Sequence, residues 1–271
     1  MPRFRPSFLE CYPPTDVPST DPPLPLAATD ALQVQALCVG LALPVGQTYR
    51  VDAQVGATAV VGVATAQALR PDLLHINPTG AALSWTPGLV GEAQLRVVDP
   101  VTGALVALCQ PLALSAEPEP YTRRVRYRDT TTSTVFDYTD PGTFQVVRLP
   151  LRLDRPSYLP DTRLAEPGSA PLYTRLSKTL RLETDYLSPQ HTEALLLALH
   201  HPTFQVLEPE TGVWEGYQLI GTPTLAWPDP VALPARTQVQ ATLRQLDFAV
   251  RTASFAPPGA FSADFTADFS Q

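Results

Sequence analysis

The stretch Thr179–Leu207, TLRLETDYLSPQHTEALLLALHHPTFQVL, decides the fold because its periodicity changes twice. In residues 180–185, leucine or threonine alternates with a charged residue, which is typical of a strand with one solvated face. Ser188 then offers an N-cap oxygen, and Pro189 occupies the first helical position, where its missing N–H costs nothing. Alternation resumes at Thr203. The pattern therefore predicts a strand, a helix over about 188–200 and a second strand.

The helix is predicted to be buried on most sides. Its residues 194–199 are apolar without a break, which differs from the one-sided pattern of a surface helix. We expect Leu195, Leu196 and Leu199 to lie in the core. Pro202 ends the helix, since a proline cannot continue the hydrogen-bond ladder.

Short strand patterns dominate the rest of the chain. Between residues 25 and 116 apolar and polar residues alternate in several short runs, for example over 49–55, and Asp99–Gly103 has the composition of a turn. This spacing favours a β-sandwich. The run Glu117–Pro120 is a stiff connector with two prolines, and the four prolines of residues 156–176 predict a long loop.

We therefore predict a mainly β fold in four parts. Residues 1–24 form an N-terminal arm, residues 25–116 a β-sandwich domain, residues 117–255 a β-rich α+β module with a single buried helix, and residues 256–271 a C-terminal arm. The chain has 31 prolines in 271 residues, roughly twice the usual share, which agrees with extended arms. In residues 237–255, a long strand region is expected to bury Val239, Ala241, Leu243 and Leu246.

Composition narrows the class of protein. A net charge of −7 argues against a general nucleic-acid binder, whose affinity comes from neutralising phosphates. No run is long and apolar enough for a signal peptide or a membrane span, so we expect synthesis in a host cytoplasm and no membrane insertion.

Because the sequence shows no export signal, we expect the three cysteines to be reduced thiols. Cys38 and Cys109 lie in the near-copies ALCVGLAL and ALCQPLAL, whereas Cys11 lies in the arm. An immunoglobulin-type disulfide is one interpretation of the pair, but Trp85 lies too near Cys109 for that pattern. Two buried small apolar residues are favoured.

The sequence predicts no catalytic residue, no cofactor site and no metal site, and hence a protein that is not an enzyme. His191 and His200 are nine residues apart, which is about 180° around a helix, so they cannot share an ion. The motifs HExxH, CxxC, GxSxG, GxGxxG and the P-loop are absent from the sequence. No small-molecule ligand is expected.

Two groups of residues are candidate interfaces. Arg124, Arg126 and Arg128 share one face of a strand, and we expect either an ordinary exposed face or a contact with an acidic neighbour. A nucleic-acid role is disfavoured by the net charge and by an expected lack of aromatic residues on that face. The second group is Phe261, Phe265 and Phe269 of the C-terminal arm, which are spaced four apart and suit grooves of a neighbouring subunit.

The segment from Tyr121 to about Arg251, and above all the quoted stretch continued to Glu208, resembles tail and baseplate proteins of tailed phages. The likeness is to their β-rich modules, which wrap one helix against a sandwich and assemble into rings around the tail axis. The resemblance implies a non-enzymatic virion or phage-tail-like component, such as a distal-tail or baseplate subunit. Its partners would be copies of itself in a ring and other tail or baseplate subunits.

A surface-binding module is the alternative function, with the 25–116 sandwich recognising carbohydrate or another protein. Trp85, Tyr49 and His75 are the candidate stacking groups for such a ligand, although burial of these residues is favoured.

Overall fold

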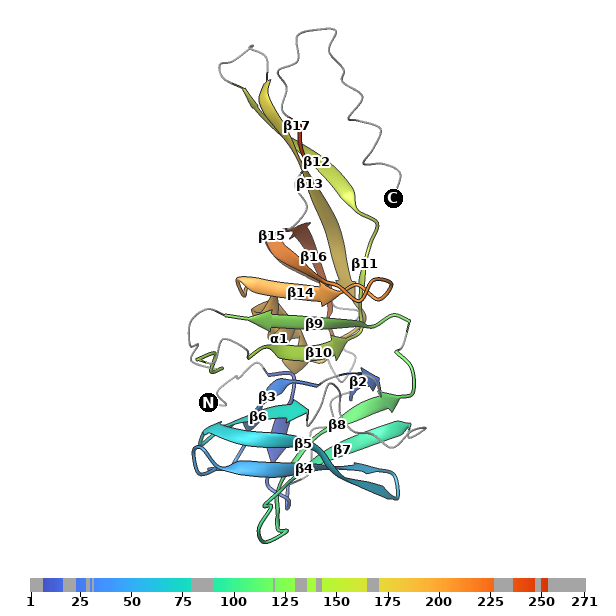
Figure 1. The fold of residues 1–271 in the computed structure, drawn as a ribbon. Coiled ribbons are helices and arrows are strands. Elements are labelled where there is room, and N and C mark those ends of the chain that lie inside the picture. Colours follow the sequence, from blue (N-terminus) through green and yellow to red (C-terminus); the bar gives the residue numbers. More distant parts are fainter. Residues whose placement is uncertain are drawn as a thin grey trace.

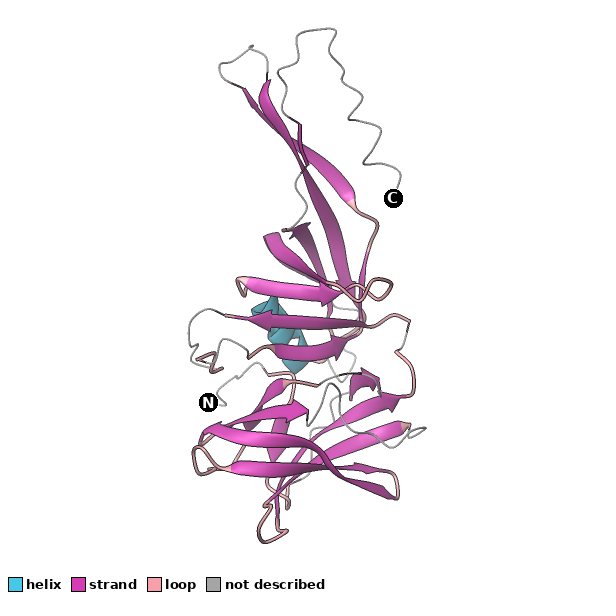
Figure 2. Cartoon of the chain, viewed as in Figure 1, coloured by secondary structure: helices cyan, strands magenta, loops and turns pink. Residues whose placement is uncertain are grey.

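The computed structural model describes residues 7–16, 23–27, 30, 32–78, 90–118, 120–129, 136–139, 143–164, 171–226, 236–246 and 250–252. These residues form mainly strands, together with one helix (Figure 2). The predicted fold class is thereby confirmed. Figure 1 shows an elongated molecule with a barrel at one end, a second sheet in the middle and a hairpin at the other end.

The first half of the chain forms a closed barrel. Its strands are β1 (Glu10–Tyr12), β2 (Leu24–Ala27), β3 (Val34–Cys38), β4 (Thr48–Val55), β5 (Thr58–Arg70), β6 (Leu73–Pro78), β7 (Gly91–Val98) and β8 (Leu105–Ser115). Within the described residues the order β1-β3-β6-β5-β4-β7-β8 returns to β1, and β2 pairs with β8 beside the ring. Alternation is regular in β4, where Tyr49, Val51, Ala53 and Val55 are buried as predicted.

Closure of the barrel differs from the expected sandwich and from the expected arm over 1–24. Strand β1 lies within that arm, and it pairs with β3 on one side and with β8 on the other. Barrels and sandwiches share the same inward alternation, so the sequence pattern does not distinguish them. Pro13 and Pro14 follow directly after β1, and so short a strand leaves little periodic signal.

The second half forms a strongly curled sheet. Its strands are β9 (Arg123–Arg128), β10 (Gln145–Leu149), β11 (Leu151–Leu153), β12 (Ser157–Leu164), β13 (Pro171–Thr184), β14 (Thr203–Leu207), β15 (Trp214–Ala226), β16 (Gln238–Gln245) and β17 (Val250–Thr252). The order is β10-β9-β14-β15-β16-β13-β11. Only Pro150 separates β10 from β11, although the two strands stand at opposite ends of this order. The sheet must therefore wrap around until its two edges meet.

Helix α1 (Pro189–Leu199) fills the inside of this curl, and it lies behind β9, β10 and β14 in Figure 1. The backbone N–H of His191 donates to the Ser188 hydroxyl oxygen at 3.2 Å, and Pro189 begins the helix, as the sequence predicts. Leu195 and Leu199 are buried, and Leu196 is half-buried against the same core. The prediction of a helix buried on most sides is confirmed.

The prediction of a loop over 156–176 was wrong. Strands β12 and β13 pair over most of this region and form a long antiparallel hairpin (Figure 1). Both prolines of the strands occupy tolerated positions, because Pro160 lies in an edge strand and Pro171 is the first residue of β13. Strand β17 pairs with residues 174–176 on the other side of β13.

One prediction for the last strand region also failed. Val239, Ala241 and Leu243 are buried in β16, but Leu246 is exposed. Leu246 follows the end of the strand and lies three residues after Leu243, so regular alternation points it away from the core.

The barrel and the second sheet share one continuous hydrophobic core, which joins residues such as Phe8 and Leu112 to residues such as Leu195 and Val239. Phe8 of the predicted arm packs edge-on against Tyr127 of β9, with ring centres 6.1 Å apart. The first residues of the chain that the structure describes are thus docked between the two halves.

Candidate functional site

The candidate site is built on strand β9. Val125 and Tyr127 point into the core, whereas Arg124, Arg126 and Arg128 share the opposite face and remain half-buried, as the alternation predicts. The neighbouring strands β10 and β14 both pair with β9. Side chains from these strands, and from β15 beyond β14, therefore lie on the same face as the arginines.

Two aromatic rings interleave with the three arginines. The Cζ atom of Arg126 lies 4.5 Å from the ring centre of Trp214 and 4.8 Å from that of Phe144. Arg124 lies over Trp214 at 5.5 Å, and Arg128 lies over Phe144 at 5.7 Å. Such contacts attract a guanidinium to the negative face of a ring. We name these five residues the arginine–aromatic face.

The expectation that this face lacks aromatic residues was wrong. Phe144 precedes β10 and Trp214 begins β15, so both rings come from other strands and only the sheet topology brings them to β9. The signal that was available is the turn over 209–212, which predicts a hairpin and therefore sets Trp214 beside Leu207. The net charge of −7 remains the argument against nucleic acid.

Arg126 and Arg128 of the arginine–aromatic face have no counter-charge within the described residues. Arg126 donates through Nε to the side-chain oxygen of Gln205 at 2.6 Å, and Arg128 donates to the backbone carbonyl of Asp129 at 3.2 Å. Neither forms an ion pair with a carboxylate in the described part of the chain. Burial, together with the nearby Arg124, lowers the pKa of Arg126 below its usual value.

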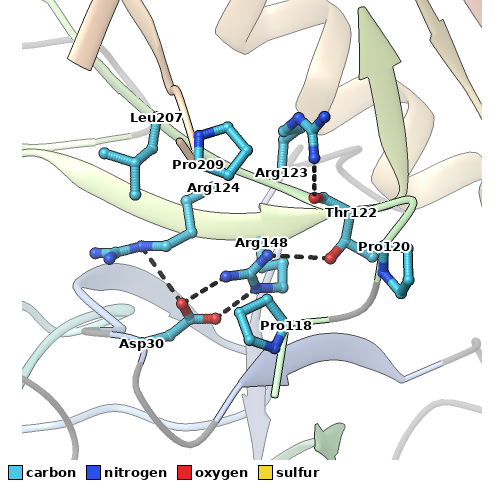
Figure 3. A pocket seen from close by; sticks show the side chains of 9 residues that line it. All are labelled: Asp30, Pro118, Pro120, Thr122, Arg123, Arg124, Arg148, Leu207 and Pro209. Carbon is cyan, nitrogen blue, oxygen red and sulfur yellow. Dashed lines mark hydrogen bonds and ion pairs between the residues drawn. The ribbon is translucent and has the colours of Figure 1, made fainter. Parts of the chain in front are cut away.

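A pocket of about 290 Å³ adjoins the arginine–aromatic face at Arg124 (Figure 3). Asp30 lies at its base and accepts two hydrogen bonds from Arg148, at 2.6 and 2.7 Å. The Nε atom of Arg124 lies 3.6 Å from the same carboxylate. Arg123 and Arg148 both donate to Thr122. Three arginines and a single carboxylate among the lining residues leave the pocket cationic, so it suits an anionic group.

The three cysteines meet at the barrel seam. Register places Cys11 of β1 opposite Cys38 of β3 and opposite Cys109 of β8. All three are buried and free, in agreement with the prediction of reduced, apolar-like residues. The neighbouring Cys109 and burial raise the pKa of the Cys11 thiol, and burial raises that of Cys38 to about 12. The thiols of Cys11 and Cys38 are therefore protonated at neutral pH.

Three histidines of the helix region pack or form hydrogen bonds within the fold. His191 lies against Phe8 with ring centres 6.2 Å apart, and the exposed His200 caps the helix by donating from Nδ1 to the carbonyl of Leu196 at 2.7 Å. The buried His201 contacts the carbonyl of Leu197 at 2.8 Å and the hydroxyl of Tyr138 at 3.3 Å. Among the residues that the structure describes, no cluster of three or more potential ligands could hold a metal ion.

The candidate carbohydrate-stacking groups do not form a surface. Tyr49 and His75 are buried in the barrel, and Trp85 lies outside the described residues, as do Phe261, Phe265 and Phe269. In the same described ranges, no helix has the length and apolar character needed to cross a membrane.

Comparison with known proteins gives no family assignment. No family model, no curated protein and no solved structure matches the chain. Function must therefore be argued from the geometry.

Proposed function

We propose that the chain is a non-enzymatic structural subunit of a phage tail or phage-tail-like particle, of the distal-tail or baseplate type. It acts through contacts with copies of itself, arranged in a ring, and with other tail or baseplate subunits. The resemblance of residues 179–208 to such proteins motivates the class of particle.

The hairpin β12–β13 is the observation that carries this proposal. Strand β13 is 14 residues long, but only its residues 179–183 pair with β16 of the second sheet. The rest of the hairpin extends beyond the sheet (Figure 1). Within the described residues, no strand pairs with the outer edge of β12.

An open strand edge on a projecting hairpin favours assembly. Its unpaired N–H and C=O groups form a template for the backbone of another chain. A hairpin is also marginally stable alone, so contact with a neighbour stabilises it. If such an edge pairs with a different surface of the next copy, the contact is head-to-tail and generates a ring when the rotation closes.

The test is to shorten the hairpin. Leu159 pairs with Ser177, so replacing residues 160–176 by Asn-Gly keeps the base of the hairpin and supplies a two-residue turn. The wild-type chain should form rings in negative-stain micrographs and a particle heavier than 29.4 kDa in light scattering. The shortened chain should stay monomeric and keep a cooperative thermal melting transition.

A matched control shortens a turn in the barrel. Asp99 N–H donates to the Ala104 carbonyl, so residues 100–103 can likewise be replaced by Asn-Gly. This variant should assemble like the wild type. A wild-type chain that remains monomeric at high concentration and with its neighbouring gene products would contradict the proposed function.

The surface-binding alternative now depends on a different group of residues. A pocket of about 530 Å³ at the barrel seam is lined by Glu10, Tyr12, Leu37, Cys38, Val39, Gly40, Leu41 and Asp72. A tyrosine ring beside two carboxylates suits a neutral sugar, because the ring stacks and the carboxylates accept hydroxyl hydrogens. Glycan-array binding that is lost in Tyr12→Ala would favour this function.

A further inference from the structure

The arginine–aromatic face has the composition of a binding surface. Trp and Arg residues dominate the energetics of protein interfaces, and planar guanidinium groups match carboxylates in a bidentate way. Arg126 and Arg128 hold their positions through ring contacts and neutral acceptors, and no carboxylate of the described residues neutralises them. A suitable partner therefore brings carboxylates and apolar rings together.

The C-terminal sequence of the chain has this chemistry. Residues 253–271 contain no Lys or Arg, and the run FSADFTADF over 261–269 places Asp264 and Asp268 among three phenylalanines. The two carboxylates are four residues apart, as are Arg124 and Arg128 on β9. In extended chains four residues span about 13 Å in both cases, so the two carboxylates can reach across the row of three arginines.

The course of the chain favours a second copy as the source of this segment. The last described strand, β17, pairs with residues 174–176 on the projecting part of the hairpin. Strand β17, which ends at Thr252, thus lies at the end of the molecule away from β9 (Figure 1). A segment that begins there starts on the projecting hairpin, which is the part of the molecule that the proposed function places against a neighbouring subunit.

We infer that the arginine–aromatic face of one copy binds residues 261–269 of a second copy. The inference rests on the proposed function, since it names the partner segment of that assembly. Asp264 and Asp268 pair with the arginines, and phenylalanine rings pack beside Trp214 and Phe144. The 290 Å³ pocket next to Arg124 accommodates a side chain of the segment.

Charge reversal in the full chain tests the inference. Variant one carries Arg126→Glu and Arg128→Glu, and variant two carries Asp264→Arg and Asp268→Arg. Each alone should stay monomeric in light scattering at concentrations where the wild type assembles, because its face and its segment then have the same sign. The mixture of the two variants should assemble, because each face then meets a segment of opposite charge on the other chain.

The control is Arg244→Glu, which reverses an exposed arginine of β16 that donates to Gln218. It should assemble like the wild type, and circular dichroism should be unchanged in all variants. If the wild type assembles and each reversal variant alone also assembles, the inference is overturned and the proposed function is left intact. A wild type that does not assemble would contradict the proposed function itself.

Two further outcomes would also overturn the inference. If the mixture stayed monomeric while one chain carrying all four substitutions assembled, the segment would bind its own copy. If a single-stranded thymidine oligonucleotide bound the wild type and not variant one, the face would serve nucleic acid. Stacking between aromatic rings and a cationic groove is the geometry such binding requires.

Discussion

Arg148 of β10 holds the carboxylate of Asp30, 118 residues earlier in the chain, through two hydrogen bonds in a buried setting. The carboxylate also accepts a hydrogen bond from the backbone N–H of Ala27 at 2.9 Å. This single side chain therefore ties the segment before the barrel strand β3 to the second sheet. A second contact between the two halves joins Gln35 of β3 to Gln145 of β10. The side-chain oxygen of Gln145 accepts a hydrogen bond from the backbone N–H of Gln35 at 2.7 Å.

Replacing Asp30 by alanine should strongly destabilise the protein. The substitution leaves the buried Arg148 without a counter-charge, and breaking such a pair typically costs about 3–5 kcal/mol. Urea unfolding measures the loss. Asp72→Ala is the matched control, because its pair with Arg70 is solvent-accessible and surface pairs contribute about 0–1 kcal/mol. Equal losses in the two variants would refute a special role for the Asp30 pair.

The leucines of α1 should differ according to their burial. Leu195→Ala and Leu199→Ala each remove a buried side chain and should cost about 2–5 kcal/mol of unfolding free energy. Leu196→Ala should cost less, because Leu196 is half-buried. Thermal melting of the three variants gives the order. A larger effect at Leu196 than at Leu195 would contradict the described orientation of the helix.

The cysteines should resist alkylation until the chain unfolds. All three thiols are buried, the pKa values of Cys11 and Cys38 are raised, and the thiolate is the reactive form. Labelling with iodoacetamide, counted by mass spectrometry, should be slow in buffer and complete in urea. The variant Val101→Cys provides the control, since that position is 91% exposed and should label at once. Rapid labelling of Cys11 in buffer would show that the barrel seam opens.

Alkali should destabilise the protein through Cys38. Its pKa rises on folding from 9.0 to about 12, so the folded state binds the proton more tightly. The stabilisation is fully present below pH 9 and is lost as the pH rises toward 12. Urea midpoints of the wild type and of Cys38→Val, measured on both sides of pH 9, should therefore show the wild type losing stability relative to the variant in alkali. A constant difference would refute this linkage.

Acid should destabilise the protein through His201, whose pKa falls on folding, whereas that of Cys38 rises. Burial lowers its pKa below 6.5, so the unfolded state takes up the proton first. The stabilisation is present above pH 6.5 and is lost as the pH falls. His201→Gln should flatten the fall in stability between neutral and mildly acidic pH. An unchanged slope in His201→Gln would refute this linkage.

The sequence predicted the elements whose conformation depends on residues that are neighbours along the chain. Ser188 and Pro189 fix the start of α1, and the turn Asp99–Gly103 forms as expected, with Asp99 accepting from the N–H groups of Val101 and Thr102. The buried residues of β4 follow from alternation alone. These features depend on neighbours in sequence, so one chain is enough to find them.

What was missed depends on pairing between distant residues. The part that β1 plays in closing the barrel requires Cys11 to lie between Cys38 and Cys109. The hairpin β12–β13 was hidden by prolines, which strands tolerate at an edge, as at Pro160, or at the first residue, as at Pro171. The rings of Trp214 and Phe144 reach the arginines only because β14 and β10 flank β9. Alternation indicates which face a residue occupies but not which strand lies beside it.

The place of β1 in the barrel has a consequence for synthesis on the ribosome. Cys11 and its partner Cys109 are about a hundred residues apart, and translation adds about 5–20 residues per second. The first strand to emerge thus waits about 5–20 s for the strand that completes the ring. During this interval the Cys11 thiol lacks its native cover, so it is open to oxidation before β8 is made. The ring of Phe8 stays uncovered for longer, until Tyr127 and His191 are made, and it can be bound by holdase chaperones during that time.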